Sequence, residues 1–207
     1  MEMNPRQPRP SVLVPALLLG LYVVEFIVLA IHPHDRMTWW AENIPILAVV
    51  IALAALSFRF RFSAGSYLAM SVLVVFHTIG GHFTFERVPF GLVTDLFGFE
   101  RNHFDRLAHF SVGFYAYPIA ELLERFRLTR SRVILLLFPV FAIFTVAALY
   151  EIIEWIYAAM AGSEAGAAFL GSQGDVWDAQ KDMLADGLGA IVAAAVYGWT
   201  SRKRKLY

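Results

Sequence analysis

The sequence contains no cysteine among its 207 residues. Disulfide bonds and thiolate metal ligands are therefore excluded, and a bound metal would need imidazole or oxygen ligands. Charged residues are also scarce, at 16%, whereas 58% of the residues are hydrophobic. These hydrophobic residues form long runs instead of the alternation typical of a soluble β-sheet, which indicates an integral membrane protein.

Six of the hydrophobic runs are long enough to cross a bilayer, which takes about 20 helical residues. We expect membrane spans at 11–31, 41–58, 66–83, 104–123, 132–159 and 182–200. The first run is too long for a signal peptide and no cleavage site follows it, so we interpret it as a retained span. The predicted fold is an all-α, polytopic bundle of six transmembrane helices that forms one transmembrane domain over residues 11–200.

The basic residues are distributed unevenly between the predicted loops. Twelve of the seventeen Lys and Arg residues lie in the N-terminal segment 1–10, in or beside the second and fourth loops, and in the basic tail 201–207. Because loops rich in Lys and Arg stay on the cytoplasmic side, both termini are predicted to be cytoplasmic. The same residues are too few and too divided to predict a nucleic-acid partner.

Acidic and imidazole side chains gather at the outer ends of four predicted spans. Asp105 and His109 are four residues apart and share one helical face, and Glu151 and Glu154 are three apart. The last span begins with acids spaced three, four and four residues apart, namely Asp175, Asp178, Asp182 and Asp186. Ionisable groups at membrane depth are costly unless they are paired or hydrated, so this convergence predicts a functional site.

A cation among these side chains would balance their charge. Imidazole and carboxylate ligands without thiols suit zinc, manganese, magnesium or iron. The predicted ligands are His82, Asp105, His109, Glu151, Glu154, Asp178, Asp182 and Asp186. Two alternatives stay open, because some carboxyl groups can be protonated and because Arg101, Arg106 and Lys181 can neutralise part of the charge. Which of His77, His82 and His103 faces the site is also open.

Three motifs, in the order "DRLAHF", "YEIIEW" and "KDMLADGLGA", resemble the VanZ-like family of small bacterial membrane proteins. The combination of "HTIGGHFTFERVP" with "ERNHFDRLAHF" more closely resembles the YjdF-type inner-membrane proteins, whose function is unknown. The resemblance implies a multi-pass protein of the bacterial cytoplasmic (inner) membrane, with family positions at Asp105, His109, Glu151, Asp182 and Gly189. Glu154 and Asp186 depart from the VanZ-like pattern, which has Gln and Asn there, and both departures add a carboxylate.

These observations favour a metal-binding site open to the outer face. It would serve metal-dependent hydrolysis or binding of a lipid or envelope-precursor head group, with Glu151 or Glu154 as general base and Arg101 or Arg106 holding phosphate. The expected partners are membrane lipids and a lipid-linked small-molecule substrate. The alternatives are a protein that binds or transports divalent cations or protons, and a non-catalytic accessory subunit. The apolar inner halves of the spans disfavour transport.

Overall fold

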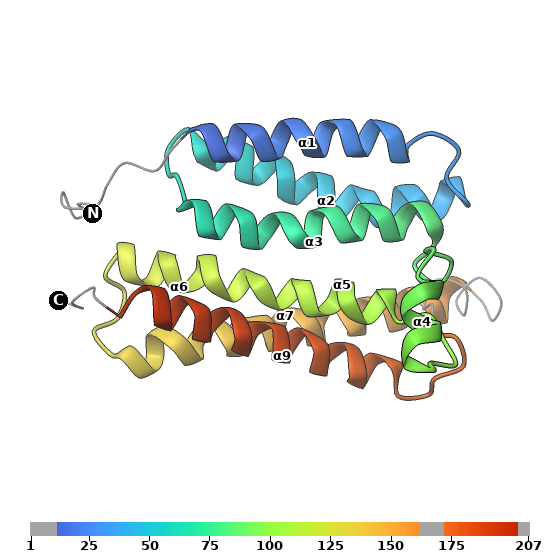
Figure 1. The fold of residues 1–207 in the computed structure, drawn as a ribbon. Helices are drawn as coiled ribbons and strands as arrows, with labels where there is room; N and C mark the ends of the chain where they lie inside the picture. Colours follow the sequence, from blue (N-terminus) through green and yellow to red (C-terminus); the bar gives the residue numbers. More distant parts are fainter. Residues whose placement is uncertain (1–11, 162–171, 203–207) are drawn as a thin grey trace.

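A computed structural model describes residues 12–161 and 172–202, and the regular structure in these ranges is helical. The long helices lie side by side as roughly parallel rods (Figure 1). In chain order the elements are α1 (Leu13–Leu29), α2 (Arg36–Ser57), α3 (Ala64–Phe83), α4 (Gly91–Phe97), α5 (Phe104–Val112), the 3₁₀-helix η1 (Gly113–Tyr115), α6 (Ala116–Arg125), α7 (Arg132–Ala161) and α9 (Asp178–Thr200). The all-α membrane fold predicted from the sequence is confirmed.

Four helices, α2, α3, α7 and α9, are long and apolar enough to cross a membrane. The 17-residue α1 is apolar but shorter. The remaining expected span corresponds to α5, η1 and α6, which follow one another along a single rod (Figure 1). The six expected spans thus correspond to these five helices and one interrupted rod.

The interruption of the rod at η1 has a local cause. Pro118 has no N–H to donate to the carbonyl of Phe114, so the regular α-helical hydrogen-bond pattern cannot pass through this turn. A short 3₁₀ segment, Gly113–Tyr115, occupies this part of the rod instead. The sequence analysis predicted one uninterrupted helix over 104–123, and the structure corrects this to two α-helices joined by a tighter turn.

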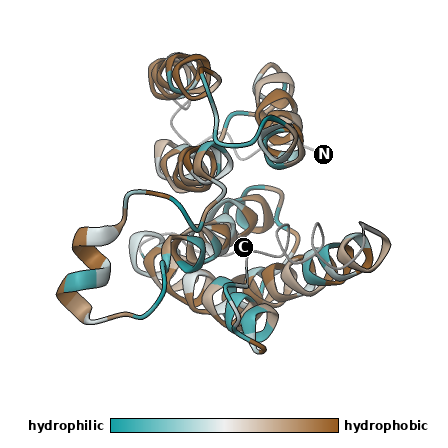
Figure 2. Cartoon of the chain, turned by 90° about the vertical axis from the view of Figure 1, so that its right-hand side faces the viewer, coloured by the Kyte–Doolittle hydropathy of each residue, from teal (hydrophilic) through white to brown (hydrophobic). Residues whose placement is uncertain are grey.

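Three helices begin earlier than predicted, α3 by two residues and α2 and α9 by a full turn or more. The added turns of α2 and α9 carry polar side chains. The α2 helix begins at Arg36 because the Asp35 carboxylate caps it, accepting a hydrogen bond of 2.7 Å from the Thr38 N–H. The α9 helix begins at Asp178. The seven-residue α4 was not predicted; it lies within the long third loop and projects beside the bundle (Figure 2).

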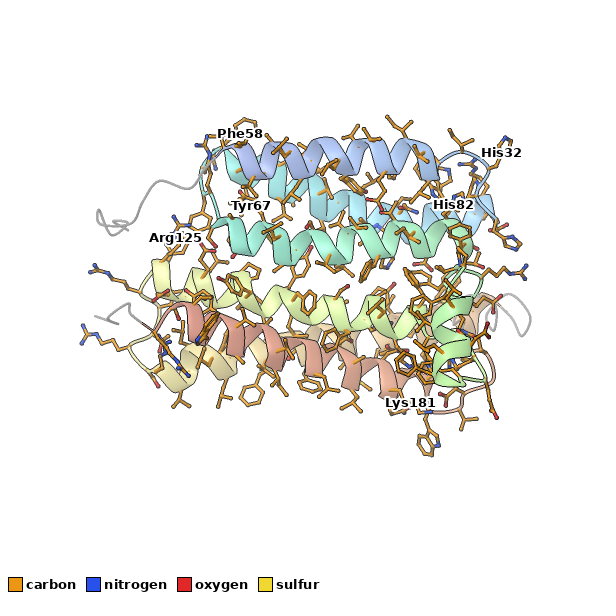
Figure 3. All side chains as sticks on the ribbon, viewed as in Figure 1. His32, Phe58, Tyr67, His82, Arg125 and Lys181 are labelled. Carbon is orange, nitrogen blue, oxygen red and sulfur yellow. The ribbon has the colours of Figure 1, made fainter. Side chains whose placement is uncertain are left out.

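The two ends of the bundle differ in the side chains they carry. We call the end with Phe58, Tyr67 and Arg125 the terminal end, and the end with His32, His82 and Lys181 the distal end (Figure 3). The α1 helix begins and α9 finishes at the terminal end (Figure 1). Along the sides between them, large apolar residues are exposed, as expected for a surface in contact with lipid.

The α9 helix is central to packing, since it contacts α5, η1, α6 and α7. Its closest approach is at glycine: a β-carbon added to Gly189 would lie 1.9 Å from the Phe110 carbonyl oxygen, and one added to Gly113 would lie 2.2 Å from the Ala190 nitrogen. The two backbones are therefore in direct contact, as small residues allow in membrane helices. A cluster of buried alanines continues the contact toward the terminal end, with Ala116, Ala190, Ala193 and Ala194.

We expect the Gly189→Ala substitution to destabilise the fold. The added methyl group meets backbone rather than a flexible side chain, so the helices must separate, at a cost of about 1–3 kcal/mol. Thermal unfolding in detergent should show a lower Tm. Gly20→Ala is the matched control, because nothing lies within 4 Å of a β-carbon at Gly20. An unchanged Tm for Gly189→Ala would contradict the close contact.

Candidate functional site

A cavity of about 250 Å³ lies between helices α2, α3, α5, α7 and α9. This volume leaves room for a cation with several waters, at about 30 Å³ per water. Its lining is unusually polar for the interior of an apolar bundle. The polar side chains that line it are Thr38, Glu42, His77, Thr84, Asp105, His109, Tyr150, Glu154, Asp182 and Asp186.

The imidazole of His109 lies between three carboxylates. Its Nδ1 is 3.4 Å from the Asp186 Oδ2, while its Nε2 is 3.8 Å from the Asp105 Oδ1 and 3.7 Å from the Asp182 Oδ1. In the neutral tautomer that donates from Nδ1 to Asp186, the lone pair of Nε2 faces Asp105 and Asp182. A carboxylate that orients the other ring nitrogen in this way is the common partner of a metal-binding histidine.

The spacing of these atoms suits a metal ion. Asp105, His109 and Asp182 each offer one ligand atom, and the three atoms lie within 4.8 Å of one another. Ligands held at about 2.0–2.2 Å from one ion are about 3–4 Å apart, so a small inward movement would complete the group. Asp186 is 1% exposed, and its Oδ1 has no hydrogen-bond partner among the described residues.

Two arginines and a lysine form ion pairs with Asp182 and with the acids next to it, Asp175 and Asp178. Arg106 donates hydrogen bonds to Asp182 and Asp178, and the Arg101 Nη1 is 2.8 Å from the Asp178 Oδ1. The Lys181 Nζ, on the first turn of α9, is 2.6 Å from the Oδ2 of Asp175 in the preceding loop, and this hydrogen bond lowers the pKa of the Asp175 carboxyl. The basic side chains thus neutralise part of the acidic charge, as one sequence-based alternative held.

The ion pairs do not balance the local charge. The network contains five carboxylates and three permanently charged basic groups, and His109 is neutral in the tautomer described above. The five acids are Asp105, Asp175, Asp178, Asp182 and Asp186, and the three bases are Arg101, Arg106 and Lys181. With His109 neutral two negative charges remain, and with a proton on its imidazole one remains. In a membrane this charge must be removed by protons or balanced by a cation.

The structure brings together some of the predicted ligands and separates others. Asp105, His109, Glu154, Asp182 and Asp186 line the cavity. Asp178 pairs with the two arginines, and Glu151 does not line the cavity, although its Oε1 is buried without a hydrogen-bond partner in the described part of the chain.

The three uncertain histidines fall in three different places. The His82 Nδ1 is 2.7 Å from the Leu29 carbonyl oxygen, so this ring faces α1. His103 packs against Phe99, with ring centroids 4.5 Å apart. His77 is the one that lines the cavity.

Two cavity residues, Glu42 and His77, are absent from the predicted ligands. The Glu42 Oε2 lies 3.7 Å from the His77 Nε2, and Glu42 is only 8% exposed. The sequence could have identified Glu42 as a candidate ligand, because it is an acid near the outer end of the second predicted span, at the depth of the other acids. His77 and His82 are five residues apart and face different directions, so sequence spacing did not decide between them.

The helices and the lipid-facing sides define an integral, multi-pass membrane protein. Residues 14–204 match the family described as Predicted membrane protein (DUF2238), and the chain belongs to this family. It is also 35% identical over 163 residues to the Inner membrane protein YjdF of Escherichia coli (strain K12), covering 78% of each chain. The predicted multi-pass location in the inner membrane is confirmed. No solved structure matches the chain.

We expect the Arg106→Gln substitution to destabilise the protein strongly. It leaves Asp178 and Asp182 buried without their main basic partner, and breaking a buried ion pair in this way costs about 3–5 kcal/mol. Thermal unfolding of the purified protein measures the effect. Arg87→Gln is the control, since the Arg87 side chain is 56% exposed and, within the described part of the chain, forms an ion pair only with its neighbour Glu86; its expected cost is about 0–1 kcal/mol. Equal Tm values for the two variants would contradict this account.

Proposed function

We propose that this inner-membrane protein binds a divalent cation through Asp105, His109 and Asp182. The observation that carries the proposal is the placement of His109, with one ring nitrogen toward Asp186 and the other toward the two aspartates. The Asp186 Oδ1, which has no hydrogen-bond partner among the described residues, and the negative charge that the ion pairs leave unbalanced support it further. One imidazole among several carboxylates favours manganese, iron, zinc or magnesium.

The proposed site faces the outer side of the membrane. We retain six spans with both termini in the cytoplasm, because basic residues cluster at the terminal end, where Arg125 lies (Figure 3). The cavity lies toward the opposite end, and buried apolar side chains of α6, α7 and α9 fill the space between them. This packing favours a binding or catalytic site that is closed on the cytoplasmic side over a transport path for ions.

Hydrolysis of a lipid-linked head group is the reaction that this site would support. Asp105, His109 and Asp182 would hold the cation, which would supply an acidified water for the reaction. Glu154 in the cavity wall would accept the proton of that water and return it to the leaving oxygen as the new bond to the phosphorus or acyl carbon forms and the bond to the leaving oxygen breaks. The resemblance to the VanZ-like family supports an envelope substrate. The role of Arg101 and Arg106 as phosphate ligands stays a prediction, because both already pair with acids.

Elemental analysis of the purified protein tests the cation site. We expect wild-type protein loaded with Mn²⁺ to retain metal after desalting, whereas His109→Ala and Asp182→Asn lose the ion of this site and hold less metal than the wild type. Asp186→Asn should weaken binding about 10–100-fold, as is usual for a residue that orients a metal-binding histidine. Asp95→Asn, in the exposed α4, is the control that keeps its metal. Equal metal contents in all variants, or none in any, would refute the proposal.

The orientation is testable because the chain has no cysteine of its own. We expect Val176→Cys, in the loop before α9, to react with a membrane-impermeant maleimide in intact spheroplasts. Leu128→Cys, in the loop between α6 and α7, should react only after the membrane is opened. Both native side chains are well exposed, at 84% and 59%, so accessibility in the fold does not limit the labelling. The reverse pattern would place the site on the cytoplasmic side.

A further inference from the structure

The α2 and α3 helices contribute a second acidic and imidazole group to the same cavity. Glu42 is 8% exposed and lines the cavity, yet its carboxylate has one polar contact among the described residues, 3.7 Å from the His77 Nε2. The His77 Nδ1 is buried and has no hydrogen-bond partner in the described part of the chain. A buried carboxylate with so little compensation indicates that something else occupies the cavity beside it.

The arginines and the lysine of the His109 group do not pair with the acids of this wall. Arg101, Arg106 and Lys181 pair with aspartates of the other group, and within the described ranges neither Glu42 nor Glu154 forms an ion pair with an arginine or lysine. Glu42 and Glu154 come from α2 and α7 and line one cavity with His77. When both are ionised, these two carboxylates match the charge of a second divalent cation.

The distance between the Glu42 and His77 side chains also suits a metal ion. The 3.7 Å between the Glu42 oxygen and the His77 nitrogen is within the range of about 3–4 Å for two ligands of one ion. We infer that the cavity holds a second divalent cation, bound by Glu42 and His77, beside the one bound by Asp105, His109 and Asp182. Glu154 lines the same cavity and would have to move toward this pair to complete the site, because among the described residues only Asp105, His109 and Asp182 form a group of three within 4.8 Å. This inference rests on the proposed function and extends it from one cation to a pair.

A pair of cations narrows the class of substrate. Two metal ions about 3.5–4 Å apart stabilise both the attacking and the leaving oxygen in a displacement at phosphorus. The site would therefore favour a phosphate ester or diphosphate over a carboxylic ester. In the paired arrangement Glu154 would be a metal ligand, and the proton of the attacking water would pass through water molecules in the cavity to the leaving oxygen.

Counting bound Mn²⁺ on the full-length protein in detergent tests the inference. After loading and desalting, we expect two Mn²⁺ per wild-type chain and one in Glu42→Gln and in His77→Gln. The matched control is Glu25→Gln, an acid of α1 that does not line the cavity; one of its oxygens is also buried without a hydrogen-bond partner among the residues that the structure describes. This variant should keep two Mn²⁺. Fully loaded wild type should give a spin-coupled Mn²⁺ resonance spectrum, and the two cavity variants the signal of an isolated ion.

The outcomes separate this inference from the proposed function. One Mn²⁺ in wild type, unchanged in Glu42→Gln, overturns the second cation and leaves the first site intact. Two Mn²⁺ in both proteins overturn the assignment to Glu42. No bound Mn²⁺ in wild type overturns both proposals. His77→Gln decides the question if Glu42→Gln does not fold, and a single-ion spectrum at full loading of two would show that the cations are not neighbours.

Discussion

The direct contact between the backbones of α5–η1 and α9 determines how the rest of the site is arranged. Gly189 lies three residues beyond Asp186, and Phe110, whose carbonyl oxygen it meets, directly follows His109. The contact therefore holds the acid and the imidazole at one depth and on facing surfaces. Larger residues here would separate the helices, and the contacts of 3.4–3.8 Å around His109 would be lost.

Such close packing carries an electrostatic cost. It brings several carboxylates together in a medium that solvates charge poorly, and like charges at these distances repel one another. Arg106 offsets part of this repulsion because it extends from α5, between Asp105 and His109 in sequence, to Asp178 and Asp182 on α9. It acts as a cation that the chain itself supplies. The charge that Arg106, Arg101 and Lys181 leave unbalanced is the physical reason to expect a bound metal.

Much of this organisation was predictable from local sequence patterns. Hydrophobic run lengths indicated the helices, and the spacings of Asp105 with His109 and of Asp182 with Asp186 indicated shared helical faces. The break at Gly113–Tyr115 was not predicted, although Pro118 is visible in the sequence. Prolines are common within membrane helices, and whether one interrupts the helix depends on how neighbouring groups satisfy the backbone.

By itself the sequence determined that the chain is a helical membrane protein and that its acids and imidazoles gather at one end. These properties depend on residue type and on spacing within one helix. The tertiary structure alone decided that Glu42 and His77, rather than His82, line the cavity with His109. The reason is that side chains on different helices meet according to the rotation and depth of each helix. Contacts between distant segments, such as Gly113 with Ala190, set that rotation and depth.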